Sequence, residues 1–98
     1  MNIQISKFGE ILMSRPAGKD AFSMANAYIF SDLTPDEKIE LDFAGVKVLT
    51  PSWADEFVTG IKKSFSNTIE FLNTDNESVE ASLKMILEPV DVTKYERK

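Results

Sequence analysis

Two hydrophobic periodicities alternate along this chain, and their alternation constrains the fold more than any other feature of the sequence. Near the N-terminus, and again in residues 39–43 and 69–72, apolar side chains alternate with polar ones, as in half-buried strands. Between these runs, apolar residues recur at every third or fourth position, as on one face of a helix. The predicted order is β-β-α-β-α-β-α, which favours right-handed crossovers and a mainly parallel sheet.

The N-terminal segment is interpreted as a β-hairpin. Ile3 and Ile5 alternate with polar neighbours, and residues 10–13 form a second short extended run beyond Gly9. Residues 39–49 are expected to form the central strand. The prediction is therefore an α/β fold with a mixed sheet that begins with a hairpin and carries its helices mainly on one face.

The chain is long enough for one domain and too short for two. Its 98 residues, with 43% apolar side chains, can bury one core, so residues 1–98 are assigned to a single domain. Within it, Val90–Val92 is predicted to be a short edge strand, and residues 93–98 a charged tail.

The first helix is predicted to begin near Ser14, which is a candidate N-cap followed by Pro16 in the first turn. Five residues at helical spacing are predicted to form its buried face: Ala17, Ala21, Met24, Ala25 and Tyr28. A later helix, capped by Asn76 or Ser78, is predicted to bury a similar apolar face.

The most clearly marked helix begins at residues 50–52. Its apolar face repeats at intervals of four, through Trp53, Phe57, Ile61 and Phe65. Two N-caps fit the sequence equally: Thr50 followed by Pro51, or Ser52 with Asp55 three residues on. Gly60 is expected to allow a close approach to the sheet.

The composition excludes several classes of function. The chain has neither cysteine nor histidine, which removes disulfides, thiol nucleophiles, common zinc sites and imidazole catalysis. No paired carboxylates or activated serine replace them, so we expect no enzymatic activity, no cofactor and no metal. The net charge of −5 disfavours nucleic acid and anionic membrane surfaces as partners. No leader-like or membrane-spanning apolar run is present, and a cytoplasmic protein is expected.

Two basic residues near the first helix define a candidate anion site. Arg15 and Lys19 flank Gly18 close to a helix start, where backbone N–H groups attract anions. An anion or nucleotide sensor is therefore kept as an alternative function, beside an ordinary capped turn. A homodimer formed through aromatic-rich helices is a further alternative.

The strongest local signal is the strand-turn-helix stretch from Leu41 to Phe57. Whichever residue is the cap, unpaired N–H groups and the positive end of the helix dipole gather around Ser52. A phosphate on Ser52 would be stabilised there and would add about two negative charges to the surface. The candidate partner-binding and switch residues are Thr50, Pro51, Ser52, Trp53, Asp55 and Glu56.

This stretch resembles the central signature of STAS domains, the fold of anti-sigma-factor antagonists. In those domains a strand of the type V-D-L-S-G-V leads to D-S-S-G-L at a helix start. The stretch is more similar to a bacterial STAS-like family of unknown function, which carries L-D-F-x-G-V and then a serine, an aromatic residue, alanine, Asp and Glu. Residues 41–46 and 52–56 match this pattern.

The resemblance implies a non-catalytic module that docks to a histidine-kinase-like ATPase or an anti-sigma-type protein. In STAS antagonists this ATPase phosphorylates the serine at the helix start, which corresponds by position to Ser52. Three residues depart from the antagonist motif. Thr50 replaces its Asp, Pro51 replaces the preceding Ser, and Trp53 replaces a Gly. The bulk of Trp53 beside Ser52 puts phosphorylation in doubt and leaves a purely structural cap as the alternative.

Overall fold

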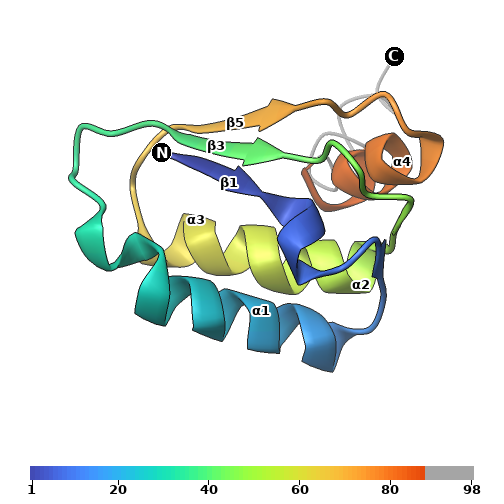
Figure 1. The fold of residues 1–98 in the computed structure, drawn as a ribbon, viewed down its shortest axis with the longest axis horizontal. Coiled ribbons are helices and arrows are strands. Elements are labelled where there is room, and N and C mark those ends of the chain that lie inside the picture. Colours follow the sequence, from blue (N-terminus) through green and yellow to red (C-terminus); the bar gives the residue numbers. More distant parts are fainter. Residues whose placement is uncertain (88–98) are drawn as a thin grey trace, which may run out of the picture.

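The computed structural model describes residues 1–87, and its centre is a three-stranded parallel sheet (Figure 1). The strands are β1 (Asn2–Gln4), β3 (Ile39–Asp42) and β5 (Ile69–Leu72), in the order β1-β3-β5. The predicted α/β class is confirmed, and so is the central position of the strand that begins at Ile39. The strand is shorter than expected, because the chain leaves the sheet after Asp42.

The predicted N-terminal hairpin is wrong. Strand β2 (Ile11–Leu12) pairs in parallel with β4 (Val48–Leu49) in a separate two-stranded sheet, whereas β1 pairs in parallel with β3. Between β1 and β2 the chain forms a 3-10 turn, η1 (Ile5–Phe8), which buries Ile5 completely and carries β2 away from β1. Within residues 1–87 all strand pairs are parallel, so the sheet is not mixed.

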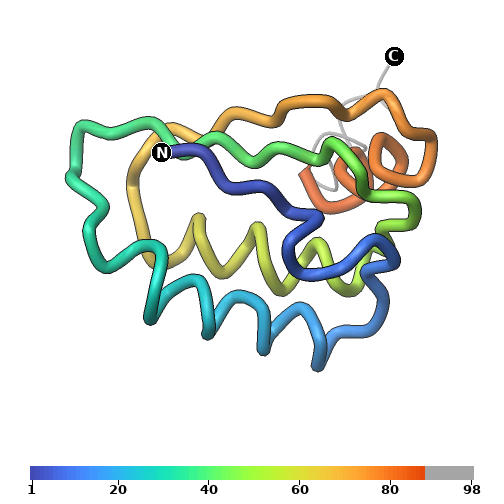
Figure 2. The backbone as a smooth tube through the Cα atoms, viewed as in Figure 1, coloured from blue at the N-terminus to red at the C-terminus, as the bar shows by residue number. Residues whose placement is uncertain are grey.

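The helices lie mainly on one face of the three-stranded sheet, as predicted (Figures 1 and 2). Helix α1 spans Arg15–Tyr28 and is followed by a 3-10 turn, η2 (Phe30–Asp32). A second helix runs without interruption through α2 (Pro51–Ala54), a π-helical turn η3 (Asp55–Thr59) and α3 (Gly60–Ser64). Helix α4 (Glu77–Leu87) packs against α2 and β4 at the end of the sheet where β3 and β5 terminate.

The alternation in the strands assigns the two faces of the sheet. Ile3, Ile39 and Leu41 are buried toward the helices, whereas the residues between them are at least partly exposed. The outer face carries polar contacts, such as the hydrogen bond from Asn2 Nδ2 to Glu40 Oε1 at 3.3 Å. The core therefore lies between the sheet and the helices.

Two glycines bring α1 close to the second helix. A Cβ on Gly18 would lie 2.6 Å from the carbonyl oxygen of Trp53, and a Cβ on Gly60 would lie 3.0 Å from the ring of Phe22. Gly60 therefore faces α1, not the sheet as the sequence had suggested. The helices approach this closely because both residues lack a Cβ: Gly18 leaves no space for a methyl group, and at Gly60 the ring of Phe22 would have to shift to admit one.

Of the five residues predicted to form the buried face of α1, two are buried and three are exposed. Ala21 and Ala25 are buried, but Ala17 is exposed, and Met24 and Tyr28 are 57% and 80% exposed. The contact at Gly18 rotates the helix so that its buried stripe runs through the small residues. The apolar residues beside that stripe consequently face outward.

Two segments predicted from the sequence lie beyond residue 87. The predicted edge strand Val90–Val92 and the charged tail 93–98 fall beyond the described residues. None of the helices within residues 1–87 has the length and apolar content needed to cross a bilayer.

Candidate functional site: the start of helix α2

A tight turn carries the chain from the sheet to the helix start. The carboxylate of Asp42 accepts hydrogen bonds from Asn73 Nδ2 at 2.7 Å and from the N–H of Ala44 at 2.9 Å. These bonds, that from Asn73 foremost, hold the pKa of Asp42 below its ordinary value. Gly45 then adopts a φ of 87°, which a residue with a Cβ tolerates poorly. Asp42 thus has a structural role in the turn.

The structure selects Thr50 as the N-cap of α2, with Pro51 in the first turn. Thr50 Oγ1 accepts from the N–H of Trp53 at 3.5 Å and donates to the carbonyl of Leu12 at 3.2 Å. The N–H of Thr50 also donates to Leu12 O, at 3.0 Å. One residue therefore caps the helix and ties its start to β2.

Few unpaired N–H groups remain at this helix start. Pro51 has no N–H, that of Trp53 is capped, and that of Ala54 donates to Thr50 O at 3.0 Å. The N–H of Ser52 has no hydrogen-bond acceptor within residues 1–87. The side chain of Ser52 is half-buried, so the hydroxyl and the free N–H stand together in the first turn.

Helix α4 closes the other side of the helix start. Ser82 Oγ donates to Leu49 O at 2.6 Å, and Ser78 Oγ accepts from the N–H of Leu49 at 2.7 Å. Two serine hydroxyls thus satisfy backbone groups of β4 on the side opposite to β2. Asn76 caps α4 through the N–H groups of residues 78 and 79, which resolves the alternative left open by the sequence.

The candidate anion site and the candidate switch meet at one place. Arg15 Nη1 lies 2.8 Å from both Asp55 Oδ2 and Glu56 Oε2. Arg15 begins α1, and the two carboxylates follow the first turn of α2, so the contact joins the starts of the two helices. The hydrogen bond from Arg15, followed by that from the hydroxyl of Thr59, holds the pKa of Asp55 below its ordinary value.

The structure corrects the interpretation of Trp53. Trp53 is 2% exposed, so its ring belongs to the core and supplies almost no area to a contact surface. The indole stacks on Phe57 with ring centroids 5.0 Å apart, and Phe8 packs against both rings. The π-helical turn begins directly after these first-turn residues, and such turns occur frequently at functional sites. Trp53 supports the surface from below.

Lys19 follows Arg15 by one helical turn on α1 and lines a groove of about 400 Å³ between α1 and the second helix. Lys63 lines the same groove, together with Asp55 and Glu56. Both of these carboxylates contact Arg15. Lys19 and Lys63 also face the groove, and within residues 1–87 neither forms an ion pair with a carboxylate. Arg15 is thus engaged by carboxylates, whereas Lys19 of the same candidate anion site is not.

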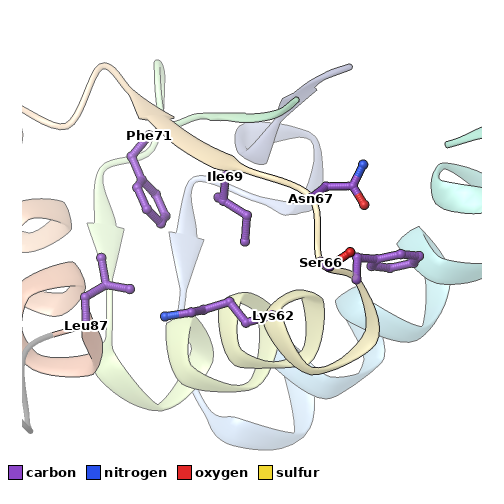
Figure 3. Close-up of a pocket in the computed structure, with 7 residues that line it drawn as sticks. Lys62, Ser66, Asn67, Ile69, Phe71 and Leu87 are labelled. Atoms are coloured by element: carbon purple, nitrogen blue, oxygen red, sulfur yellow. The ribbon is translucent and has the colours of Figure 1, made fainter. Parts of the chain in front are cut away.

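A second cavity, of about 380 Å³, was not predicted (Figure 3). Ile69 and Phe71 of β5 point into it, and the stem of Lys62 on α3 lies opposite them. Asn67 lines the rim, but its amide already donates to the carbonyls of Thr34 and Glu37. One cation above an apolar wall does not assemble a reactive site.

Sequence reasoning missed the contacts that join distant segments. Arg15 and Asp55 are 40 residues apart, and Ser82 and Leu49 are 33 apart. No spacing rule in a single sequence pairs such residues, although the serines on the inner face of α4 were a signal that could have been noticed.

Taken together, the fold and the site define a small parallel α/β domain with a hydroxyl-bearing helix start next to its sheet. The family model described as "STAS-like domain of unknown function (DUF4325)" matches residues 27–79, more than half of the chain. The chain therefore belongs to this STAS-like family. Neither the curated proteins nor the solved structures give a significant match.

Proposed function

We propose that this protein is a non-catalytic regulatory module that binds a protein partner through the surface at the start of helix α2. The proposed contact residues are the half-buried Thr50, Pro51 and Ser52, with Asp55 and Glu56 beside them. The observation that carries the proposal is the N–H and hydroxyl of Ser52, which residues 1–87 leave available at a helix start that is otherwise capped. The STAS-like family assignment supports a regulatory role, and a cytoplasmic location fits it.

The proposed partner is an ATPase of the histidine-kinase-like fold or an anti-sigma-type protein. Phosphorylation of Ser52 would bring about two negative charges to within one helical turn of Asp55 and Glu56. The phosphate would repel these carboxylates and compete with them for the guanidinium of Arg15. The modification would thereby change both the charge of the surface and the contact that joins the two helix starts.

The test uses the full chain and the histidine-kinase-like ATPases of the same genome, assayed one at a time with ATP and Mg²⁺. We expect one ATPase to bind the wild type and to phosphorylate Ser52, detected by mass spectrometry. Ser52→Asp is expected to weaken this binding by about tenfold or more, because like charges meet at the interface. Ser64→Asp, at the exposed far end of the same helix, is the matched control and should bind normally.

The proposal fails if neither an ATPase nor an anti-sigma-type protein of that genome binds the wild type, or if the two aspartate variants lose binding equally. Circular dichroism of each variant shows whether its helices are intact. Ser52→Ala distinguishes the two roles of the hydroxyl, since it abolishes phosphorylation while leaving the uncharged surface for docking.

Anion sensing remains the second candidate function, and Lys19 and Lys63 in one groove favour it. A phosphorylated ligand between them would raise the melting temperature by mass action, by several degrees at a ligand concentration far above Kd. Thermal-shift measurements with nucleotides and phosphorylated metabolites at millimolar concentration test this function. The shift should disappear in the Lys19→Gln, Lys63→Gln double variant, and no shift in the wild type would exclude it.

A further inference from the structure

A continuous apolar groove runs between β1, the turn η1 and helix α1. It consists of two hollows, of about 300 and 250 Å³, which share Lys7, Phe8 and Met24. Trp53 lines one hollow, and Ile29 lines the other. Each hollow has room for one or two apolar side chains.

The rim of this groove carries most of the large apolar side chains that the described residues leave exposed. Ile11 is 62% exposed and Met13 54%, and both line the groove. Met24 lines both hollows, and the 80% exposed Tyr28 follows it by one helical turn on α1 without lining either. Both were predicted from their periodicity to be buried. Contiguous apolar surface of this kind typically marks a contact with another molecule.

The groove borders an open strand. Strand β1 is an outer strand of the sheet, and within residues 1–87 no strand pairs with its other side (Figure 1). In a parallel pair alternate residues direct their backbone groups to opposite sides, so Asn2 presents its N–H and C=O groups to this edge, and Gln4 presents its N–H. The carbonyl of Gln4 belongs to the N-cap of η1. The three residues of β1 also carry no charge, whereas proteins commonly use charged residues to block strand addition.

Charge favours a second copy of this chain as the occupant. The chain carries a net charge of −5, so most of its surface repels another copy. The charged residues that line the groove, among those described, are one cation and one anion, Lys7 and Asp20. Neither belongs to an ion pair within residues 1–87. The groove is therefore electrically neutral, with a charge of each sign available.

From these observations we infer that two copies of the protein form a symmetric dimer through the groove between β1 and α1. In a symmetric (isologous) interface, residue i of the first copy contacts residue j of the second, and residue j of the first contacts residue i of the second. Lys7 of each copy then faces Asp20 of its partner, and the exposed Met24 and Tyr28 fill hollows of the partner. The β1 edges meet, so the two sheets continue across the dimer. This surface is separate from Ser52, and the inference goes beyond the proposed function.

The first test measures the mass of the full-length wild-type chain in solution. Sedimentation velocity and light scattering, over about a hundredfold range of concentration, are expected to show a monomer–dimer equilibrium. Met24→Lys and Tyr28→Lys should each shift the protein to monomer, because they place a charge in the apolar contact. Met85→Lys is the matched control: Met85 is 64% exposed on α4, away from the groove, and this variant should dimerise like the wild type.

The second test uses charge reversal. Lys7→Glu is expected to weaken dimerisation by about tenfold or more, since the new carboxylate of one copy would face Asp20 of the other. Adding Asp20→Lys should restore the affinity, because the pair is then re-formed with its signs exchanged. Such a rescue cannot arise from a general loss of folding, and circular dichroism verifies the fold of each variant.

A wild type that stays monomeric throughout the concentration range overturns the inference, even if the groove binds some other molecule. Dimers that are lost equally in the Met85→Lys variant, or that are not rescued by the double charge reversal, also overturn it. None of these outcomes bears on Ser52, so the dimer and the proposed partner binding succeed or fail separately.

Discussion

The start of helix α2 and the groove beside β1 differ in how completely the chain satisfies its own groups. At the helix start, Thr50 caps the backbone and bonds to Leu12, two serines of α4 hold Leu49, and Arg15 contacts two carboxylates. In the groove, large apolar side chains are exposed and, within residues 1–87, one strand edge is open. The two regions adjoin at Trp53, which lines the groove and supports the helix start.

The difference indicates two ways in which a small domain can be used for recognition. A region whose groups are mostly paired, as at the helix start where the N–H and hydroxyl of Ser52 remain available, changes its surface when something is added to it, such as the phosphate proposed at Ser52. A region with unpaired apolar area gains stability whenever a complementary surface covers it. The helix start is therefore suited to a switch, and the groove to a standing contact.

The sharpest test of this contrast uses two adjacent residues of α1. Gly18→Ala should destabilise the protein by about 2 kcal/mol, because the new methyl group overlaps the backbone of Trp53. An ordinary exposed Gly→Ala change in a helix interior gains about 1 kcal/mol, so the predicted sign is reversed. Urea unfolding followed by circular dichroism measures the difference.

Ala17→Leu is the matched control for that substitution. Ala17 is exposed and lines the groove, where a larger side chain has space. Measured at the same low protein concentration, this variant should change the free energy of unfolding by no more than about 0.5 kcal/mol. If Gly18→Ala were as stable as the wild type, the helix start would not be closely packed and the contrast would collapse.

A smaller effect is expected from the cap itself. Thr50→Val keeps the shape of the side chain but removes the acceptor for the N–H of Trp53 and the donor to Leu12 O. The loss should be about 1 to 2 kcal/mol in urea unfolding. Thr50→Ser retains the hydroxyl and should recover most of it. Equal stability of the valine and serine variants would show that the hydroxyl does not cap the helix.

Local and distant features were unequally predictable from the sequence. The helix starts were identified because a cap, a proline and an apolar repeat lie within a few residues of one another, as at Thr50 and Pro51. The predicted N-terminal pairing was wrong because it joined β1 to the next extended segment along the chain. The real partner, β3, lies 38 residues further on, with Asn2 opposite Glu40. The topology of the whole chain determines which strands pair, and hydrophobic periodicity alone does not predict that topology.

The candidate functional residues follow the same division. Residues 50–56 could be proposed as a site because the motif is continuous in sequence. Periodicity found the apolar residues of α1 but not their exposure, since the contact at Gly18 sets the rotation of the helix. The role of Arg15 was assigned to an anion because its true neighbours, Asp55 and Glu56, come from a different helix.

The ion pair between Arg15 and Asp55 should give the smallest effect, and it is separable by pH. The folded pKa of Asp55 is held below its ordinary value of 3.8, chiefly by the hydrogen bond from Arg15. A carboxyl with a lowered folded pKa stabilises the protein above its unfolded pKa, and this contribution is lost as the pH falls through the folded value. Because both side chains are substantially exposed, solvent screening keeps the effect small.

The measurement compares the wild type with Asp55→Asn in urea at a series of pH values. Asp42 also has a lowered pKa, so the acid unfolding of the wild type alone would not isolate Asp55. The stability difference between the two proteins should be constant near neutral pH and should shrink below pH 3.8, as Asp55 becomes protonated. In an Arg15→Met background the same difference should be smaller at neutral pH and should change less with acid. No stability difference near neutral pH would mean that Asp55 acts through its bond to Thr59, which an asparagine can still accept, and that the helix start is not joined by charge.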